Sequence, residues 1–117
     1  MEREAGYSRA VVQGDWCFVS GTTGYDYATM TMPSNVEDQT RQALRTIENT
    51  LREAGFAMRD VVRAQYTVTE RAFVERVFPI LGEAFGDTRP AATMVIADLV
   101  AEAMLVEIEV TALRATT

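Results

Sequence analysis

A chain of 117 residues has the size of one domain, so we expect a single domain over residues 1–117. Its 17 acidic residues outnumber its 11 basic residues, giving a formal charge of −6. This balance argues against a nucleic-acid partner, because clustered basic side chains bind the phosphate backbone. The sequence has no histidine, which excludes a serine–histidine–acid triad. Hydrophobic residues make up 48% of the sequence, which leaves apolar surface for a subunit partner.

The sequence offers little for metal or membrane binding. Cys17 is the only cysteine and lies in the apolar run 16–19, where we expect it to fill the core. No set of histidine or cysteine ligands exists, so we expect no metal site. Residues 1–4 lack the pattern of a signal peptide, and no apolar stretch reaches the ~20 residues of a membrane span. We therefore expect a cytoplasmic location and no membrane partner.

In the first half of the chain we expect two strands and a helix. Residues 7–12 and 15–21 read as strands joined by a tight turn at Gly14-Asp15, and a loop or a short extra strand follows over 21–33. Ser34-Asn35-Val36-Glu37 has the form of a capping box with Ser34 as N-cap, and the helix it begins should end at Gly55. The apolar stripe of this helix comprises Val36, Ala43, Leu44, Ile47, Leu51 and Ala54.

In the second half we expect a strand, a helix and two further strands. Residues 61–69 alternate, with Val62, Ala64, Tyr66 and Val68 on one face. A helix is predicted over 72–85, where Pro79 should cause a kink or a restart near Phe78. Residues 93–99 and 105–114 are predicted as the last strands, linked by a turn at 100–104.

The element order β-β-α-β-α-β-β predicts an α+β fold, a mixed sheet with two helices on one face. The other face of the sheet needs a cover, because strands as apolar as 15–21 and 93–99 would expose a large patch. Oligomerisation through the sheet is the natural solution.

The segment 106–110 alternates strictly between apolar and acidic residues, the pattern of a strand with one buried face. Glu107 and Glu109 then point to the other face together, about 7 Å apart at their β-carbons. Glu107 could be a solvated strand residue, one arm of an ion pair between subunits, or a residue of a binding cleft. For Glu109 a structural salt bridge is the expected role.

Several motifs together resemble the YjgF/Rid (reactive intermediate deaminase) family over essentially the whole chain. They are Gly6-Tyr7-Ser8-Arg9-Ala10, Phe18-Val19-Ser20-Gly21, Gln39-Thr40-Arg41-Gln42-Ala43-Leu44, Glu53-Ala54-Gly55, Asp60-Val61-Val62, Arg89-Pro90-Ala91 and Val106-Glu107-Ile108-Glu109. The resemblance implies a chorismate-mutase-like fold and a homotrimer with small-molecule clefts between subunits. Active members hydrolyse enamines and imines such as 2-aminoacrylate or 2-iminobutanoate, without a cofactor.

Carried over by position, the resemblance implies one catalytic residue, Glu107, which would position or activate water. The positions implied to bind substrate are Tyr7, Ser20, Gly21, Ala92 and Thr93. For Tyr7, a partly buried strand aromatic is an equal alternative.

The chain departs from the family at the arginine that clamps the substrate carboxylate, because Pro90-Ala91 is followed by Ala92. Arg89 precedes the proline and is not expected to replace the missing group. Arg9 should share a strand face with Tyr7, which makes it one conceivable replacement cation. The loop 22–27 is either a packed surface loop or a binding loop in which Tyr25 or Tyr27 stacks on a ligand.

The leading expectation is therefore cofactor-free hydrolytic deamination of an enamine or imine in an intersubunit cleft. The alternative is a non-catalytic small-molecule-binding trimer that has lost the cleft arginine. A third class, ribonuclease or translation inhibitor, is disfavoured by the charge of −6 and the absence of histidine.

Overall fold

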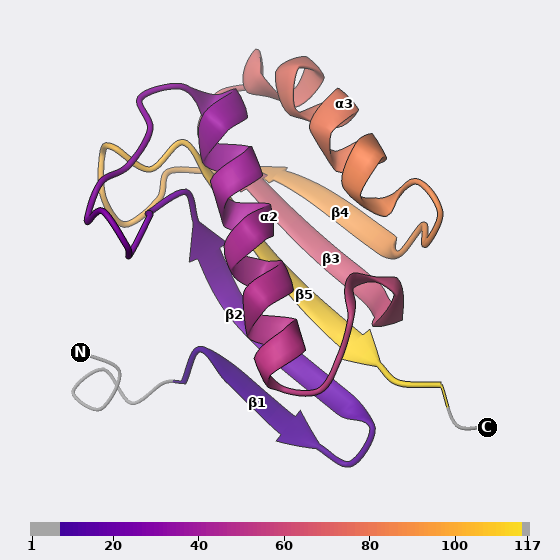
Figure 1. Cartoon of the computed structure of the whole chain (residues 1–117). Coiled ribbons are helices and arrows are strands. Elements are labelled where there is room, and N and C mark those ends of the chain that lie inside the picture. Colours follow the sequence, from indigo (N-terminus) through magenta and orange to yellow (C-terminus); the bar gives the residue numbers. More distant parts are fainter. Residues whose placement is uncertain (1–7, 116–117) are drawn as a thin grey trace.

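The computed structural model describes residues 8–115 (Figure 1). The strands are β1 (Ala10–Gln13), β2 (Trp16–Thr23), β3 (Val61–Val68), β4 (Ala91–Ile96) and β5 (Val106–Leu113). The helices are α2 (Val36–Glu53) and α3 (Phe73–Phe85), with a short 3-10 turn, Met58–Asp60, before β3. This order is the predicted β-β-α-β-α-β-β, so the α+β fold class is confirmed.

The five strands form one mixed sheet in the order β1-β2-β5-β3-β4. β3 and β4 are parallel, whereas the other neighbouring strands are antiparallel. The last strand, β5, lies in the centre, and both helices lie across the same face of the sheet (Figure 1). Neither helix is long and apolar enough to cross a membrane within the described residues.

Helix α2 buries the predicted apolar stripe, with only its last member, Ala54, partly exposed. The predicted N-cap was wrong by one residue. Asn35 is the cap, because its backbone is extended and its side-chain oxygen accepts the Asp38 N–H at 2.8 Å. Glu37 forms no capping box, since its carboxylate binds the Arg76 guanidinium of α3 through two hydrogen bonds of 2.7 and 2.9 Å. The helix gives way to Gly55, whose φ of +86° is the left-handed conformation that favours glycine.

Strand β3 departs from the predicted alternation at its first residues. A bulge lies between Val61 and Arg63, where β3 uses one more residue than β5. Val61 is therefore 1% exposed and Val62 is 41% exposed, so Val62 does not join the buried face as predicted. Beyond the bulge, Ala64 and the alternate residues that follow it are buried, as the pattern predicted.

Helix α3 and strand β4 also differ from the predictions. Helix α3 continues across the exposed Pro79 without a restart near Phe78. β4 covers Ala91–Ile96, beginning and ending earlier than the predicted strand 93–99, because it pairs in parallel with β3 from Arg63 onward.

The sheet face turned away from α2 and α3, here called the bare face, has no cover within residues 8–115. Trp16 and Phe18 of β2 lie on it, 42% and 45% exposed, with ring centroids 6.1 Å apart and planes at 11°. Their strand neighbours Cys17 and Val19 point the other way, into the core. The alternation of β2 thus puts two large aromatic rings on a surface that a single chain leaves open to solvent.

Candidate functional site

Glu107 lies on the bare face in the central strand of the sheet. Thr23 of β2 and Thr67 of β3 flank it in the register. Its two chain neighbours are buried in the core, so Glu107 and Glu109 share the bare face as the alternation predicted. Glu109 forms no ion pair within residues 8–115, and the expected structural salt bridge is not found there.

Gly21 allows the Glu107 carboxylate to approach the backbone of β2. The β2–β5 register shifts between Val19 and Thr22, which marks a bulge at this point. A β-carbon at Gly21 would lie 2.6 Å from both Cδ and Oε1 of Glu107, closer than side chains allow. Two residues that were predicted separately, 86 positions apart, are therefore brought into contact.

The environment of Glu107 raises its pKa above the ordinary value of 4.5. Partial burial against the sheet is the main cause, and the negative charge of Glu109 adds to it. A carboxyl group whose pKa is raised can give and take a proton nearer to neutral pH, as general acid–base catalysis requires.

The hydroxyl of Ser20, another predicted binding residue, already has a structural partner. It donates a hydrogen bond to the carbonyl of Ser8, and the Ser20 N–H donates to the Arg9 carbonyl at 2.9 Å. Through these two hydrogen bonds Ser20 holds the segment before β1 against β2, next to Gly21. Tyr7 lies outside the described residues.

Ala92 and Thr93 lie on opposite faces of β4. The register places Ala92 beside Ala64 on the helix-covered face and Thr93 beside Gln65 on the bare face. Arg63 also faces the bare side and donates to the Thr93 hydroxyl at 2.9 Å. Within one chain, Ala92, where the family resemblance predicts an arginine, and Glu107 therefore cannot belong to a single site, since the sheet separates them.

Arg89 is held at the end of α3. Its N–H donates to the Phe85 carbonyl at 2.7 Å and its guanidinium to the Gly86 carbonyl at 3.2 Å. It adopts a left-handed backbone conformation with φ of 49°. These contacts close the last turn of the helix, which is a structural role for Arg89.

Arg9 lies against the loop that follows β2. Its guanidinium carbon is 4.6 Å from the centroid of the Tyr27 ring, and the Tyr25 ring meets Tyr27 edge-on at 4.9 Å. The loop folds back on itself through two backbone hydrogen bonds between Asp26 and Thr31, of 2.7 and 3.2 Å. The structure thus joins two sequence candidates, Arg9 and the loop 22–27, in one cluster.

Gln39 is a structural residue that the helical pattern did not reveal. Its side chain is fully buried, and its amide nitrogen donates to the carbonyls of Pro33 and Ala103 at 2.8 Å each. Its amide oxygen accepts the Leu105 N–H at 2.9 Å. Gly24 packs so closely on α2 that a β-carbon there would lie 2.5 Å from the Gln39 α-carbon. One glutamine thus fixes both loops beside the Glu107 end of the sheet.

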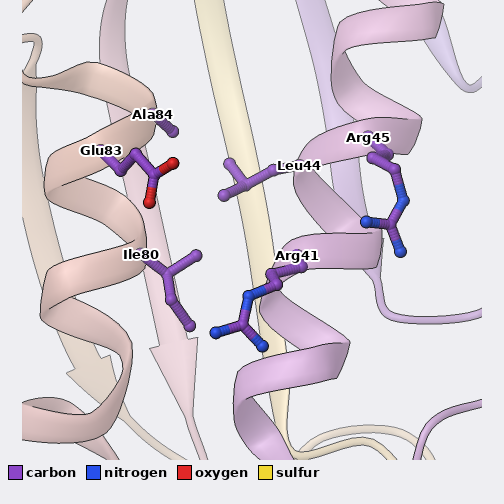
Figure 2. A pocket seen from close by; sticks show the side chains of 6 residues that line it. All are labelled: Arg41, Leu44, Arg45, Ile80, Glu83 and Ala84. Atoms are coloured by element: carbon purple, nitrogen blue, oxygen red, sulfur yellow. The ribbon is translucent and has the colours of Figure 1, made fainter.

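A groove of about 320 Å³ lies between the helices, on the opposite side of the sheet from Glu107. Leu44 of α2 and Ile80 and Ala84 of α3 contribute its apolar lining, as Figure 2 shows. Arg41 also lines it but pairs with Asp38 of its own helix at 2.8 Å. We therefore interpret this groove as the packing surface between the two helices, with charged side chains exposed to solvent at its edge.

The comparisons with known proteins agree with this fold. Residues 1–114 match the family described as Endoribonuclease L-PSP. A RutC family protein of Pyrococcus horikoshii is 29% identical over 104 residues, which cover 88% of this chain and 82% of that protein.

Two solved structures are similar over nearly their whole length. A YjgF family member from Mycobacterium tuberculosis is 41% identical with a TM-score of 0.87, covering 96% of this chain and 90% of that one. A Rid family protein of unknown function from Yersinia pestis is 29% identical with a TM-score of 0.86, covering 92% and 86%. The matched sequence, the strand order and the shared fold lead to one conclusion: this chain belongs to the YjgF/Rid family, whose family description is Endoribonuclease L-PSP.

Proposed function

We propose that this protein hydrolyses small enamine or imine acids, such as 2-aminoacrylate or 2-iminobutanoate, to the keto acid and ammonia. The reaction takes place without a cofactor, in clefts between the subunits of a homotrimer. The observation that carries the proposal is the Glu107 carboxylate, which lies against the backbone of Gly21 and has a raised pKa.

The proposed chemistry needs one group that accepts and returns a proton. Water adds to the imine carbon while the Glu107 carboxylate takes one of its protons. This proton passes to the nitrogen, which gives a carbinolamine. The carboxylate then moves the hydroxyl proton of the carbinolamine to the nitrogen as well, the carbon–nitrogen bond breaks, and the products are the carbonyl compound and ammonia. A carboxyl group whose pKa is raised by burial suits both steps better than a fully solvated one.

The placement of the site residues supports a cleft between subunits. Glu107 faces the bare side of the sheet, whereas Ala92 is at the edge strand on the helix side. Bringing both positions to one ligand requires two copies of the chain. The exposed Trp16 and Phe18 supply the apolar surface through which the copies would associate.

The test is ammonia release from freshly generated 2-aminoacrylate and 2-iminobutanoate. Glu107→Gln should abolish turnover while the protein remains folded, because the amide cannot take the proton from water. Glu109→Gln is the matched control on the same face. It should retain turnover but move the acidic limb of the pH profile to lower pH, because a like charge next to Glu107 is removed. Full activity in Glu107→Gln would rule out the proposed role.

The second candidate is a non-catalytic trimer that binds small molecules, and Ala92 is the observation that favours it. Without a clamp for the carboxylate, a small imino acid is held weakly. Ligand-dependent thermal stabilisation without turnover would support this candidate. So would ammonia release that appears only after Ala92→Arg, since the rest of the site would then be intact.

A further inference from the structure

We propose that Arg9 binds the carboxylate of the ligand and that Tyr27 holds its guanidinium in place. This inference rests on the proposed function, because it concerns the same site, and it names the group that replaces the family's missing arginine. The ligand class that fits is a small 2-imino or 2-keto acid.

The first argument is the position of Arg9 next to the Glu107 site. The β1–β2 pairing places Ala10 opposite Val19, whose side chain is in the core. The Ser20 N–H donates to the Arg9 carbonyl at 2.9 Å, so the pairing continues by one step. Arg9 and Ser20 are thus opposite each other, and strand alternation turns both side chains to the bare face.

The same face carries the Glu107 carboxylate directly over Gly21, the residue after Ser20. Arg9 before β1, Gly21 in β2 and the Glu107 carboxyl group in β5, whose pKa is raised, therefore follow one another across neighbouring segments of the sheet. In contrast, the Arg63 guanidinium extends along the bare face toward β4, at the opposite edge of the sheet from β1, where it donates to Thr93 and to the Ala91 carbonyl.

The second argument is that an aromatic ring holds the guanidinium of Arg9, which has no acidic partner among residues 8–115. Its guanidinium carbon lies over the Tyr27 ring, 4.6 Å from the centroid, a cation–π contact that does not use the N–H groups as hydrogen-bond donors. Within residues 8–115 these N–H groups donate to no acceptor, and Arg9 is in none of the four ion pairs of that region. A planar fork of N–H groups is the geometry that binds a carboxylate through two parallel hydrogen bonds.

The third argument is that the loop carrying Tyr27 is fixed. Asp26 and Thr31 exchange backbone hydrogen bonds, and the Asp26 carboxylate accepts the Ala28 N–H at 3.0 Å. Tyr25 supports the Tyr27 ring edge-on. The loop is therefore a small closed turn, and Tyr27 acts as a positioning residue that stacks on Arg9.

The test compares the kinetics of imine hydrolysis for three variants. Arg9→Gln should raise the KM for 2-iminobutanoate about ten- to a hundredfold and alter kcat much less, the range expected for loss of a charge-assisted hydrogen bond. Arg9→Lys should recover only part of this loss, because an ammonium cannot form the two parallel bonds. Arg45→Gln, which removes a cation from α2 on the helix side, is the control and should leave KM unchanged.

Binding of a stable product analogue gives an independent readout. 2-Oxobutanoate should raise the melting temperature of the unmodified protein, whereas the neutral 2-oxobutanamide should not. Arg9→Gln should abolish this difference. Tyr27→Phe should keep KM unchanged because the ring remains, and Tyr27→Ala should raise KM while the salt dependence of binding persists, since the charge is still present.

The outcomes that overturn the inference differ from those that overturn the function. Suppose that the unmodified protein is active but that Arg9→Gln has the same KM, or that only Arg63→Gln raises the KM. Arg9 is then not the residue that binds the carboxylate, and the proposed function still stands. If the unmodified protein neither releases ammonia nor distinguishes 2-oxobutanoate from its amide, the proposed function fails and this inference fails with it.

Discussion

The Glu107 carboxylate lies against a stretch of backbone that carries no side chain. Gly21 supplies this gap, and any larger residue would place a β-carbon 2.6 Å from the carboxylate. The approach removes Glu107 from part of its water, while Glu109 on the same face adds a like charge. The close approach at Gly21 of β2 and the charge of Glu109 in β5 thus act together to raise the pKa of Glu107.

The raised pKa of Glu107 makes the folded protein less stable as this group ionises. Below the ordinary value of 4.5 the carboxyl is protonated in both the folded and the unfolded chain, so it has no effect on stability. As the pH rises from there through the higher pKa of the folded state, the unfolded chain loses its proton first, and the free energy of unfolding falls. Glu107→Gln cannot ionise and should therefore melt at a higher temperature than the unmodified protein at pH 7.

This stabilisation by Glu107→Gln should shrink as the pH is lowered toward 4.5, which thermal melts at a fixed protein concentration would measure. Glu102→Gln removes the same charge from an exposed turn and serves as the control. A gain that is equal at pH 4 and pH 7 would show that the amide acts through packing and not through the ionisation of Glu107.

At the scale of elements, helix α2 holds the loops at the Glu107 end of the sheet. Its buried stripe includes three polar residues, Gln39, Thr40 and Thr50, among the apolar ones. The two threonine hydroxyls donate to carbonyls one turn back in the same helix. Gln39 differs from them, because its side-chain hydrogen bonds connect the helix to two loops, the one that directly precedes it in sequence at Pro33 and the one before β5 at Ala103 and Leu105.

Gln39→Leu should destabilise the protein, because it leaves the Leu105 N–H and two carbonyls without their partner. An unsatisfied buried backbone group costs about 1–3 kcal/mol. Urea unfolding followed by circular dichroism would measure this loss. Gln42→Leu, about one turn further along α2, is the control, since among residues 8–115 the Gln42 side chain forms hydrogen bonds only with Thr46 and Arg45 of its own helix. Equal unfolding midpoints for the two variants would contradict the role given to Gln39.

At the scale of the whole molecule, the sheet has two different faces. One is covered by both helices (Figure 1), and the other presents Trp16, Phe18 and two carboxylates to solvent in a single chain. Stacked aromatic rings on an open sheet are typical of a surface that a second subunit buries. This asymmetry is the physical basis for the proposed trimer.

Phe18→Asp should convert the proposed trimer into single subunits while leaving the fold intact, because Phe18 is outside the core. Native mass spectrometry should find three times the mass of one chain for the unmodified protein and one chain mass for the variant. Phe78→Asp, which adds the same charge at a 54% exposed phenylalanine of α3, should remain trimeric. A single-chain mass for the unmodified protein at high concentration would remove the basis of the intersubunit cleft.

Local sequence patterns were sufficient to predict the elements. Period-2 alternation in 106–110 and the apolar stripe of 36–54 gave the correct strand and helix, since each depends only on which face of an element is buried. Two of the errors arise where pairing with a neighbouring strand determines the geometry. The bulge that exposes Val62 follows from the pairing with β5, and the earlier start of β4 follows from its pairing with β3.

The sequence by itself determined the family, the fold class and the identity of Glu107 and Gly21 as candidates, because these depend on residue order and periodicity. Only the tertiary structure showed that Gly21 makes room for the Glu107 carboxylate, that Ala92 and Glu107 are on opposite faces, and that Arg9 stacks on Tyr27. The first two depend on the register between strands, and register is an outcome of packing that a single strand's pattern does not contain. The third depends on how the loop after β2 folds back toward Arg9.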